Sequence, residues 1–333
     1  MYTPPYMIGF VVRRLVVSVL VLLAASFLVF AMVANASDPL GDLRGRNPPP
    51  APEVIQARRH LLLLDKPVLQ RYWIWLTRFL HGNMGRSIAR NDNVAHLLYQ
   101  RLGVTMRMVI FAMLIAIVLA VLVGVVSAIR QYTSIDYVST FAGFLFLSTP
   151  VFWLAALLKI YGAIKINGWL GHTVVYTIGD ASSNLSGSLF HRLGDEFGHL
   201  ILPTIALALI SFAAWSRYQR ASMLDVLSSD YVRLARAKGV SNRKVIVKHA
   251  LRNALIPLTT VVAIDFGAIF GGAVITEIVF QWQGMGQLLL DAVNHSDTNE
   301  TLAWLMVSAT IVILFNLIAD ILYAFLDPRI RYG

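Results

Sequence analysis

The chain has 333 residues, of which 57% are hydrophobic and 14% charged, with a formal net charge of +10 and no cysteine. A mean hydropathy of +0.66 excludes an ordinary soluble domain, in which about a quarter of the residues are charged. Without cysteine the chain has no disulfide or thiolate site, and its composition leaves the redox compartment open.

Six apolar stretches are long enough, or nearly so, to cross a bilayer, which takes roughly 20 helical residues. They cover residues 9–33, 109–129, 137–161, 200–215, 258–280 and 302–326. The fourth is the shortest, so we expect it either to extend toward Arg220 or to be buried against its neighbours, with Pro203 in its first helical turn. The sequence thus predicts an all-α, polytopic membrane protein with six transmembrane helices.

The first stretch, residues 9–33, also has features of a secretory signal. Arg13 and Arg14 lie at its start, and Ala34-Asn35-Ala36 after it suits a cleavage site. Its apolar length exceeds that of a normal signal core, so we interpret it as an uncleaved membrane anchor.

A long polar segment, residues 34–108, separates the first two stretches. It opens on the Pro-rich run GRNPPPAPE, which cannot continue a helix. Apolar residues then recur at helical spacing, with an interruption at Lys66-Pro67 and an end at Gly82. This pattern predicts a small helical insert. Its aromatic residues suit either the membrane interface or the docking of an external partner, and both interpretations stay open: Tyr72, Trp73, Trp75 and Phe79.

The distribution of Lys and Arg among the loops predicts the orientation of the chain. Residues 217–256 contain nine basic residues, whereas residues 281–301 contain none and residues 162–199 contain two. Basic residues in short loops favour the cytoplasm, so 217–256 is expected there and the other two outside. Residues 34–101 carry ten basic residues but exceed the length over which this rule applies. Both termini are therefore expected in the cytoplasm.

Motifs for enzymatic chemistry are not found. The chain has no Gly-Lys dipeptide, which a phosphate-binding ATPase loop requires, and neither His-Glu-x-x-His nor Gly-x-Ser-x-Gly. His295, Asp297 and Glu300 are able to bind a cation, but a solvated polar turn between two spans is the preferred interpretation. We therefore expect no metal site and no catalytic residue.

Three carboxylates lie within or beside the predicted spans, where an unpaired charge is costly. A proton-coupled carrier would place such groups on its transport route. We expect structural pairing for Glu277 and for Asp320, with Arg329 and Arg331 within reach of the latter. Asp265 is the deepest of the three, and a place on the translocation path stays open for it.

The segment DYVRLARAKGVSNRKVIVKHALRNALIP, residues 230–257, predicts a helical hairpin. Residues 231–238 favour a first helix, Gly239 suits its end, and Ser241 or Asn242 is able to cap a second helix. The second helix has an apolar face at helical spacing, made of Val247, Ala250, Leu251 and Ala254. Its basic row is Lys244, Lys248 and Arg252.

A basic amphipathic helix beside a membrane commonly lies on anionic lipid, and this is one interpretation of the hairpin. Nucleic acid is a weaker one, because no reading module surrounds the segment. The small residues at the turn permit close approach of another backbone, so a protein partner accounts for both faces.

The hairpin resembles the cytoplasmic loop of ABC importer permeases, whose signature is Glu-Ala-Ala, then Gly, then Pro about twenty residues later. Here it reads Ala235-Arg236-Ala237, Gly239 and Ile256-Pro257, with the Glu missing. The form ARAKG…KHALRNALIP is similar to the peptide and nickel branch of those permeases. The similarity extends over nearly the whole chain, through LDKPVLQRYWIWL, GNMGRSI, LSTPVFWLAALL, HLILPTIALAL, GMGQLLLDAV and LYAFLDPRIRYG.

This resemblance implies a subunit of a multi-chain importer in the bacterial cytoplasmic membrane. Such a permease pairs with a second, similar permease and two ATP-binding subunits, which hold ATP and Mg, while an external protein delivers the solute. A peptide is preferred over nickel as the solute, and no cofactor is expected in this chain. The implied divisions are residues 1–33, 34–108 and 109–333, with the coupling loop at 217–257. The residues implied to contact the ATP-binding subunit are Tyr231, Arg233, Ala235, Arg236, Ala237, Lys238, Gly239, Lys244 and Lys248.

Two rival functions stay open from the residues alone. One is an ion-coupled secondary transporter with Asp265 as the coupling group, although two related halves are not evident in the sequence. The other is a scaffold or receptor that recruits cytoplasmic proteins through the basic hairpin.

Overall fold

The computed structural model describes residues 5–36, 38, 40–45, 47, 48, 50–182 and 188–326. The regular secondary structure of these residues is helical, apart from an isolated antiparallel bridge between Arg86 and Asn93. The predicted all-α class and the six spans are confirmed, although the bounds differ. The helical stretches long and apolar enough to cross a membrane are Val11–Asn35, Val94–Ile129, Val151–Leu170, Leu189–Leu227, Asn242–Gly271 and Thr298–Ile321.

The chain divides into two compact units. The first consists of Met1–Val104 and Gln283–Ile313, and the second of Thr105–Trp282 and Leu314–Gly333. Residue 108 lies inside the continuous helix α5 (Val94–Ile129). The division of the chain at residues 33 and 108 stays a prediction.

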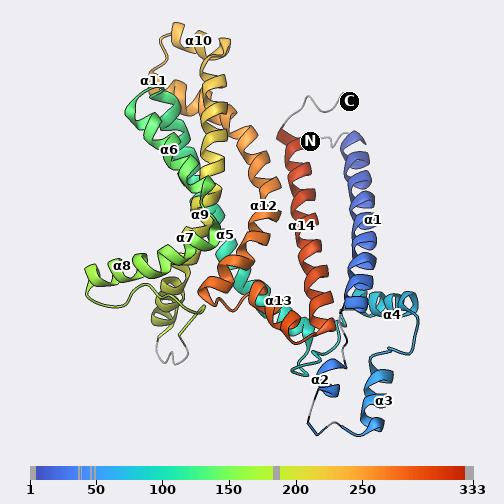
Figure 1. Ribbon diagram of the computed structural model, residues 1–333. Helices are drawn as coiled ribbons and strands as arrows, with labels where there is room; N and C mark the ends of the chain where they lie inside the picture. The colour runs from blue at the N-terminus through green and yellow to red at the C-terminus, as the bar shows by residue number, and fades with distance from the viewer. Residues whose placement is uncertain are drawn as a thin grey trace. The chain divides into compact units, whose positions relative to one another are not determined.

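The first unit contains the predicted helical insert (Figure 1). Pro52 occupies the first turn of its helix α3, where a missing N–H costs no hydrogen bond. The Lys66-Pro67 interruption separates α3 from α4, as expected. The helices that lie in this unit, wholly or in part, are α1 (Pro5–Ala36), α2 (Gly41–Arg44), α3 (Pro52–Leu61), α4 (Val68–Leu80), α5 (Val94–Ile129), α13 (Met285–Asn294) and α14 (Thr298–Leu326).

Helix α4 packs against the end of α1 through aromatic side chains. Tyr72 and Leu76 of α4 are buried with Phe30 of α1 and Leu302 of α14 in one apolar cluster. The Tyr72 hydroxyl lies 2.8 Å from the hydroxyl of Ser26, so its polar end is also satisfied. Of the predicted aromatic cluster, Tyr72 is therefore a core residue, whereas Trp73 is exposed.

The second unit is built around α9, the long helix that packs against α6, α7 and α12 (Figure 1). Close approach of α5 to α9 requires Gly124, because a Cβ there would lie 2.8 Å from Ser216 O. The elements of this unit, besides parts of α5 and α14, are α6 (Ser134–Ser148), α7 (Val151–Leu157), the π turn η1 (Leu158–Gly162), α8 (Ala163–Leu170), α9 (Leu189–Leu227), α10 (Asp230–Ala237), α11 (Asn242–Lys244), the π turn η2 (Val245–Leu251) and α12 (Arg252–Phe280).

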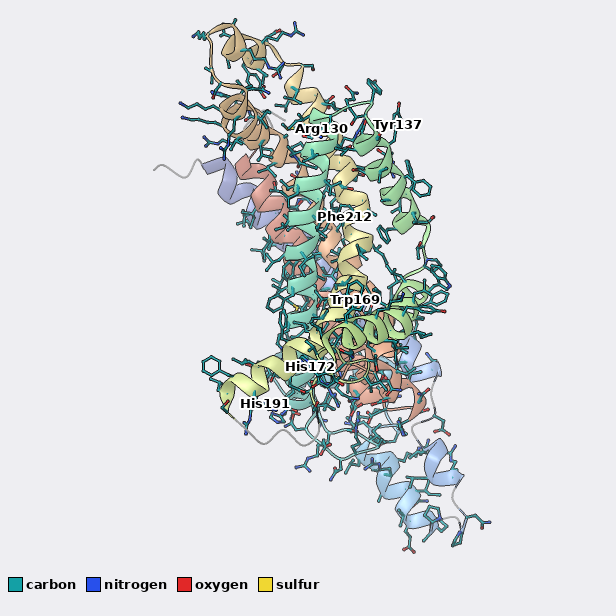
Figure 2. All side chains as sticks on the ribbon, turned by 90° about the vertical axis from the view of Figure 1, so that its left-hand side faces the viewer. Arg130, Tyr137, Trp169, His172, His191 and Phe212 are labelled. Atoms are coloured by element: carbon teal, nitrogen blue, oxygen red, sulfur yellow. The ribbon has the colours of Figure 1, made fainter. Side chains whose placement is uncertain are left out.

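The two ends of the second unit are formed by different loops. Arg130 and Tyr137, in and after the turn between α5 and α6, lie at one end, and His172 and His191 lie at the opposite end (Figure 2). The latter two belong to the segment 162–199, which the sequence places outside.

The third span differs from its prediction over residues 137–161. Helix α6 ends at Ser148 and α7 begins at Val151, so the helix breaks at Thr149-Pro150. Proline removes a helical N–H and disfavours the helical conformation of the residue before it, which explains the break. The stretch long enough to span a membrane is Val151–Leu170, and α6 is a shorter apolar helix.

The fourth span is confirmed as both extended and buried. Helix α9 covers Leu189–Leu227, and 56% of its most apolar 18-residue stretch is buried inside the protein. The placement of Pro203 in the first helical turn is wrong, since α9 starts at Leu189. Residues 189–199 include charged and polar side chains. A prediction based on a run of apolar residues therefore places the start of this helix too late.

Candidate functional site: the basic hairpin and its supports

The basic segment folds as the predicted hairpin, between the end of α9 and the start of α12. Its helices enclose an apolar core that also includes the end of α5. The buried members are Ala128, Met223, Val232, Ala235, Val245, Ala250 and Ala254. Three of these alanines belong to the hairpin, so small side chains there bring its own helices together.

Gly239 ends α10 in the left-handed conformation, with φ of +73°. Its N–H donates to Arg236 O at 3.0 Å, and the N–H of Val240 donates to Ala235 O at 3.2 Å. These two bonds form a Schellman motif, and Val240 packs against the core that contains Ala235. The expected helix end at Gly239 is therefore confirmed. A Cβ at Gly239 would meet nothing within 4 Å. Within this chain, glycine is therefore favoured there by the left-handed backbone conformation and not by lack of space.

The second helix of the hairpin departs from a regular α-helix. Ser241 occupies the N-cap position of α11, but its side chain makes no capping hydrogen bond, contrary to expectation. The π turn η2 then inserts extra backbone into the helix and shifts the side chains that follow. The inward positions are consequently Val245, Ala250 and Ala254.

This shift corrects the predicted apolar face. Ala250 and Ala254 are buried as expected, but the Val247 side chain is 57% exposed. The predicted basic row is exposed throughout: Lys244, Lys248 and Arg252. Val247 therefore adds an apolar side chain to this basic surface, whereas helical periodicity predicted it in the core.

Most of the residues expected to contact a partner lie on the surface of the hairpin. Ala235 is the exception, because its side chain is buried in the core. Leu234, which the sequence analysis did not single out, is 55% exposed. The exposed residues among those predicted are Tyr231, Arg233, Arg236, Ala237, Lys238, Gly239, Lys244 and Lys248.

Two hydrogen bonds connect the hairpin to the long helices on either side. Ser222 Oγ on α9 donates to Ala254 O on α12 at 3.0 Å. Asn253 Nδ2 on α12 donates to the Tyr231 hydroxyl on α10 at 3.0 Å. Helix α10 is thus attached to α12, and α12 to α9.

An ion pair with a buried carboxylate, which the sequence analysis missed, anchors the neighbouring turn between α5 and α6. The Arg220 guanidinium donates two hydrogen bonds of 2.7 Å to the Asp136 carboxylate. That carboxylate also accepts hydrogen bonds from Ser127 Oγ and from the Tyr132 N–H. From the sequence, Arg220 is only one of the basic residues of a loop. No motif in the sequence pairs it with a carboxylate 84 positions earlier.

Asp265 on α12 faces α9. Its Oδ2 accepts a hydrogen bond of 2.8 Å from Nε1 of the buried Trp215. No basic side chain in the described part of the chain forms an ion pair with it. A neutral partner that joins two packed helices favours a structural role for Asp265.

The other two carboxylates within or beside the predicted spans were expected to have structural partners. Glu277 is fully buried and accepts a hydrogen bond from the Thr105 hydroxyl. Asp320 is partly buried; its expected partners Arg329 and Arg331 lie outside the described residues.

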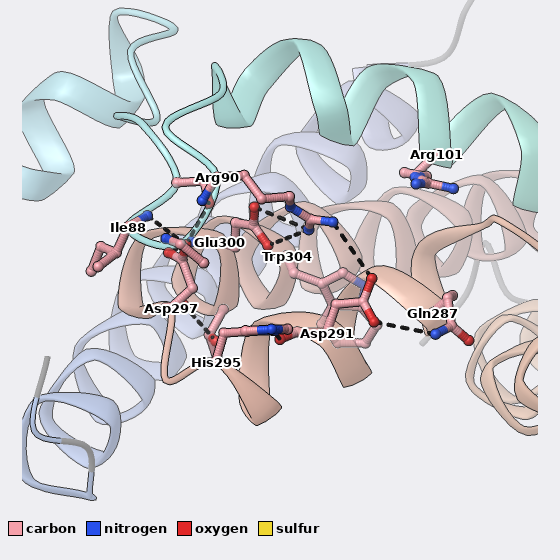
Figure 3. A network of polar contacts seen from close by, with 12 residues as sticks. Ile88, Arg90, Arg101, Gln287, Asp291, His295, Asp297, Glu300 and Trp304 are labelled. Atoms are coloured by element: carbon pink, nitrogen blue, oxygen red, sulfur yellow. Dashed lines mark hydrogen bonds and ion pairs between the residues drawn. The ribbon is translucent and has the colours of Figure 1, made fainter. Parts of the chain in front are cut away.

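The interpretation of residues 294–300 as a solvated polar turn holds for the exposed His295 but is wrong for Asp297 and Glu300. Asp297 is fully buried, and its carboxylate accepts hydrogen bonds from Ser87 Oγ, Ile88 N and Ala89 N at 2.7, 2.5 and 3.1 Å (Figure 3). A loop more than 200 residues earlier in the chain supplies these donors. Sequence spacing carries no signal for such a contact.

Arg90 completes this attachment within the first unit. Its guanidinium donates to both oxygens of the buried Glu300, at 3.0 and 3.3 Å, and lies 3.6 Å from Asp291 (Figure 3). Burial acts to lower the pKa of Arg90, but the hydrogen bond to Glu300 and the surrounding carboxylates raise it above its usual value. His295 is exposed and Asp297 is occupied by backbone donors, so this arrangement binds a loop of the chain.

Comparisons with known proteins cover almost the whole chain. Residues 120–332 match the family described as the binding-protein-dependent transport system inner membrane component, and residues 7–109 match the N-terminal part of such membrane components. The chain is 40% identical to the oligopeptide transport system permease protein OppB of Mycobacterium tuberculosis, over 98% of this chain and 99% of that protein.

Other relatives show the same full-length similarity. The chain is 36% identical to the oligopeptide transport system permease protein AppB of Bacillus subtilis, and 34% to the dipeptide transport system permease protein DppB of Alkalihalophilus pseudofirmus. Both alignments cover 98% of this chain and 100% of the relative. Among solved structures, a chain of the inward-facing MetNI methionine ABC transporter is similar in fold, with a TM-score of 0.54 and 16% identity. That match covers 69% of this chain and 96% of the other.

Proposed function

Because the chain belongs to the family of binding-protein-dependent transport system inner membrane components, we propose that it is the permease subunit of an ATP-driven importer of di- or oligopeptides. The observation that carries this proposal is the similarity over 98% of the chain to permeases named for oligopeptide and dipeptide transport. The chain is a multi-pass protein of the bacterial inner membrane, consistent with its six apolar spans.

The proposed complex contains this chain, a second and similar permease, two ATP-binding subunits and an external solute-binding protein. ATP and Mg belong to the ATP-binding subunits, since this sequence has no phosphate-binding loop. The division into a first span at 1–33, an external insert at 34–108 and a permease core at 109–333 is part of the proposal, as are cytoplasmic termini.

The hairpin at 217–257 is proposed to dock into the ATP-binding subunit. Its surface combines cations with exposed Leu234 and Val247, a mixture that suits a protein groove better than an all-basic surface would. A displacement of α10 is then transmitted to α12 through Asn253 and Tyr231, and to α9 through Ser222. Both long helices move because the hairpin core packs tightly between them.

The proposal is tested by reconstituting the complete complex in liposomes and measuring ATP turnover and peptide uptake together. Uptake that depends on ATP and on the solute-binding protein is expected, and the chain by itself is expected to hydrolyse no ATP. Uptake by the chain alone, driven by a proton gradient and lost in Asp265→Asn, would instead identify an ion-coupled transporter.

Charge reversal separates docking to the ATP-binding subunit from anchoring on lipid. Lys244→Glu with Lys248→Glu is expected to reduce the affinity of the ATP-binding subunit and the uptake per ATP, because both cations are exposed. Arg130→Glu, at an exposed arginine in the turn between α5 and α6, is the control for a general effect of charge. Full coupling in the assembled Lys244 and Lys248 variant would support lipid anchoring instead.

A further inference from the structure

The helical insert of the first unit contains an arginine-lined cavity. The cavity has a volume of about 530 Å³, within the range of small-molecule sites. Four guanidinium groups line it, from Arg58, Arg71, Arg78 and Arg86, and no carboxylate is among its described lining residues. None of the four forms an ion pair with another described residue. Arg58 and Arg71 are partly buried, where like charges without counter-charge are unfavourable unless an anion enters.

Two residues that line the cavity have buried polar atoms without partners. Trp75 Nε1 and Thr298 Oγ1 are buried, and neither has a hydrogen-bond partner among the described residues. The Thr298 residue is 8% exposed, so water has little access to it. An indole N–H is only a donor, and leaving it unsatisfied in a buried place costs free energy. Its missing partner is therefore an acceptor atom.

Two of the four arginines, Arg58 and Arg71, are held in place by the chain itself. Arg58 Nη2 donates to Ile88 O at 3.3 Å, which fixes α3 beside the loop before α5. The guanidinium carbon of Arg71 lies 5.9 Å from the centre of the Phe30 ring. Burial lowers the pKa of Arg71, because no negative charge compensates for the loss of water around it.

The surroundings of the cavity indicate where the anion comes from. Phe30, which lines it, belongs to the membrane span Val11–Asn35, close to the end of that span. On α4, Leu69, Trp73 and Leu80 are exposed and recur at helical spacing, so they form an apolar stripe. Such a stripe beside a span is typical of a helix that lies in the membrane interface, where lipid phosphates are located.

From these contacts we propose that the cavity binds an oxyanion of the phosphate class, supplied by the headgroup of an anionic phospholipid. Arg71 and Arg78 are seven residues apart and therefore lie on one face of α4, away from its apolar stripe. Their guanidiniums and the Trp75 N–H donate to the phosphate oxygens, and the apolar stripe contacts the acyl chains. The bound lipid fixes the insert against the outer surface of the membrane.

The test measures binding of a soluble short-chain phosphatidylglycerol to the purified full-length chain in a non-ionic detergent. Parallel measurements use short-chain phosphatidylcholine and inorganic phosphate, which separate an anionic headgroup from a zwitterionic one and a lipid from a free ion. Saturable binding is expected, tightest for phosphatidylglycerol. Equal affinity for inorganic phosphate would overturn the lipid source and leave a site for free phosphate.

The variants are chosen to remove donors and keep the fold. Arg71→Gln with Arg78→Gln is expected to weaken binding about 25-fold, at about five-fold for each guanidinium. Trp75→Phe removes one N–H but keeps the aromatic packing, and about a ten-fold loss is expected. The matched control is Arg59→Gln, an exposed arginine of α3 outside the cavity, with less than about a two-fold change.

Three results would overturn the proposal. The first is no saturable binding of any of the three probes, and the second is an equal loss in the Arg59 control. The third is unchanged phosphatidylglycerol binding in Trp75→Phe and in the double arginine variant, while the affinity for the external solute-binding protein falls. That result would assign the arginines to an acidic protein surface. Unchanged melting temperatures of the variants exclude unfolding as the cause of a loss.

Discussion

At Gly239 the chain requires a backbone conformation that other residues adopt only at a cost. The left-handed φ of +73° closes the Schellman motif between α10 and α11, and other L-residues pay about 1–2 kcal/mol there. Gly239→Val is expected to leave the membrane spans inserted while weakening attachment of the ATP-binding subunit or lowering uptake per ATP. The measurement is ATP turnover against uptake in liposomes.

Gly239→Asn is the informative companion variant, because asparagine tolerates the left-handed region better than valine. If only the backbone matters, the asparagine variant transports normally. If a partner's backbone comes close to Gly239, both variants lose coupling, since any side chain then clashes. Normal uptake per ATP in Gly239→Val would contradict the role of the hairpin in coupling.

The buried carboxylate of Asp136 accepts four hydrogen bonds. Asp136→Asn removes the charge opposite Arg220; because only the carboxylate of this pair is fully buried, we expect a cost below the roughly 3 kcal/mol of a fully buried pair. We expect a lower melting temperature for the purified chain and a weaker attachment of α6 to α9.

Asp225→Asn serves as the control for Asp136→Asn, since Asp225 is exposed on the same helix α9 as Arg220. Its melting temperature is expected to stay at the unmodified value. Equal shifts in the two variants would mean that the ion pair does not stabilise this end of the unit.

At the scale of elements, the loop 86–91 depends on a carboxylate from the start of α14. The N–H groups of Ile88 and Ala89 donate to Asp297, and a hydrogen bond to a charged group is worth about 1.5–3 kcal/mol. Asp297→Asn is therefore expected to increase amide hydrogen exchange in residues 87–90 by about ten-fold or more. Mass spectrometry of peptides from this loop provides the measurement.

Asp92→Asn is the matched change for this loop, because Asp92 is exposed and precedes the same helix α5. Amide hydrogen exchange of residues 87–90 in the Asp92→Asn variant is expected to match that of the unmodified chain. If Asp297→Asn leaves the exchange of residues 87–90 unchanged, the attachment in Figure 3 does not hold the loop.

For the whole molecule, the charge of the loops predicts which segments face the cytoplasm. The native chain lacks cysteine, so a single cysteine introduced at a chosen position is the only target for a thiol reagent. A membrane-impermeant maleimide added to intact cells is expected to label Asn91→Cys and to spare Asn242→Cys until the membrane is opened. Ser186, also predicted to be external, lies outside the described residues.

Labelling of Asn242→Cys in intact cells would invert the orientation and place the hairpin on the external side. Docking to a cytoplasmic ATP-binding subunit would then be impossible. If neither position is labelled, residue 91 is not accessible from outside, which contradicts the orientation predicted from the loop charges.

The sequence by itself determined the helical class, the membrane location and the hairpin with Gly239 at its turn. These features depend on local composition and periodicity: runs of apolar residues, breaks at proline and glycine, and basic residues clustered between spans. The resemblance to importer permeases rested on short motifs in order along the chain, which also require no knowledge of contacts. The family comparisons agree with it over the same length.

The tertiary structure alone decided which polar residues meet and which side of a helix is buried. Asp297 reaches a loop more than 200 positions away, and Asp136 pairs with Arg220 on another helix, so chain separation hides both contacts. Val247 was assigned to the core because a regular helix repeats every 3.6 residues, whereas the π turn η2 changes that repeat. Local sequence sets where helices form, and long-range packing sets how their faces and charges are used.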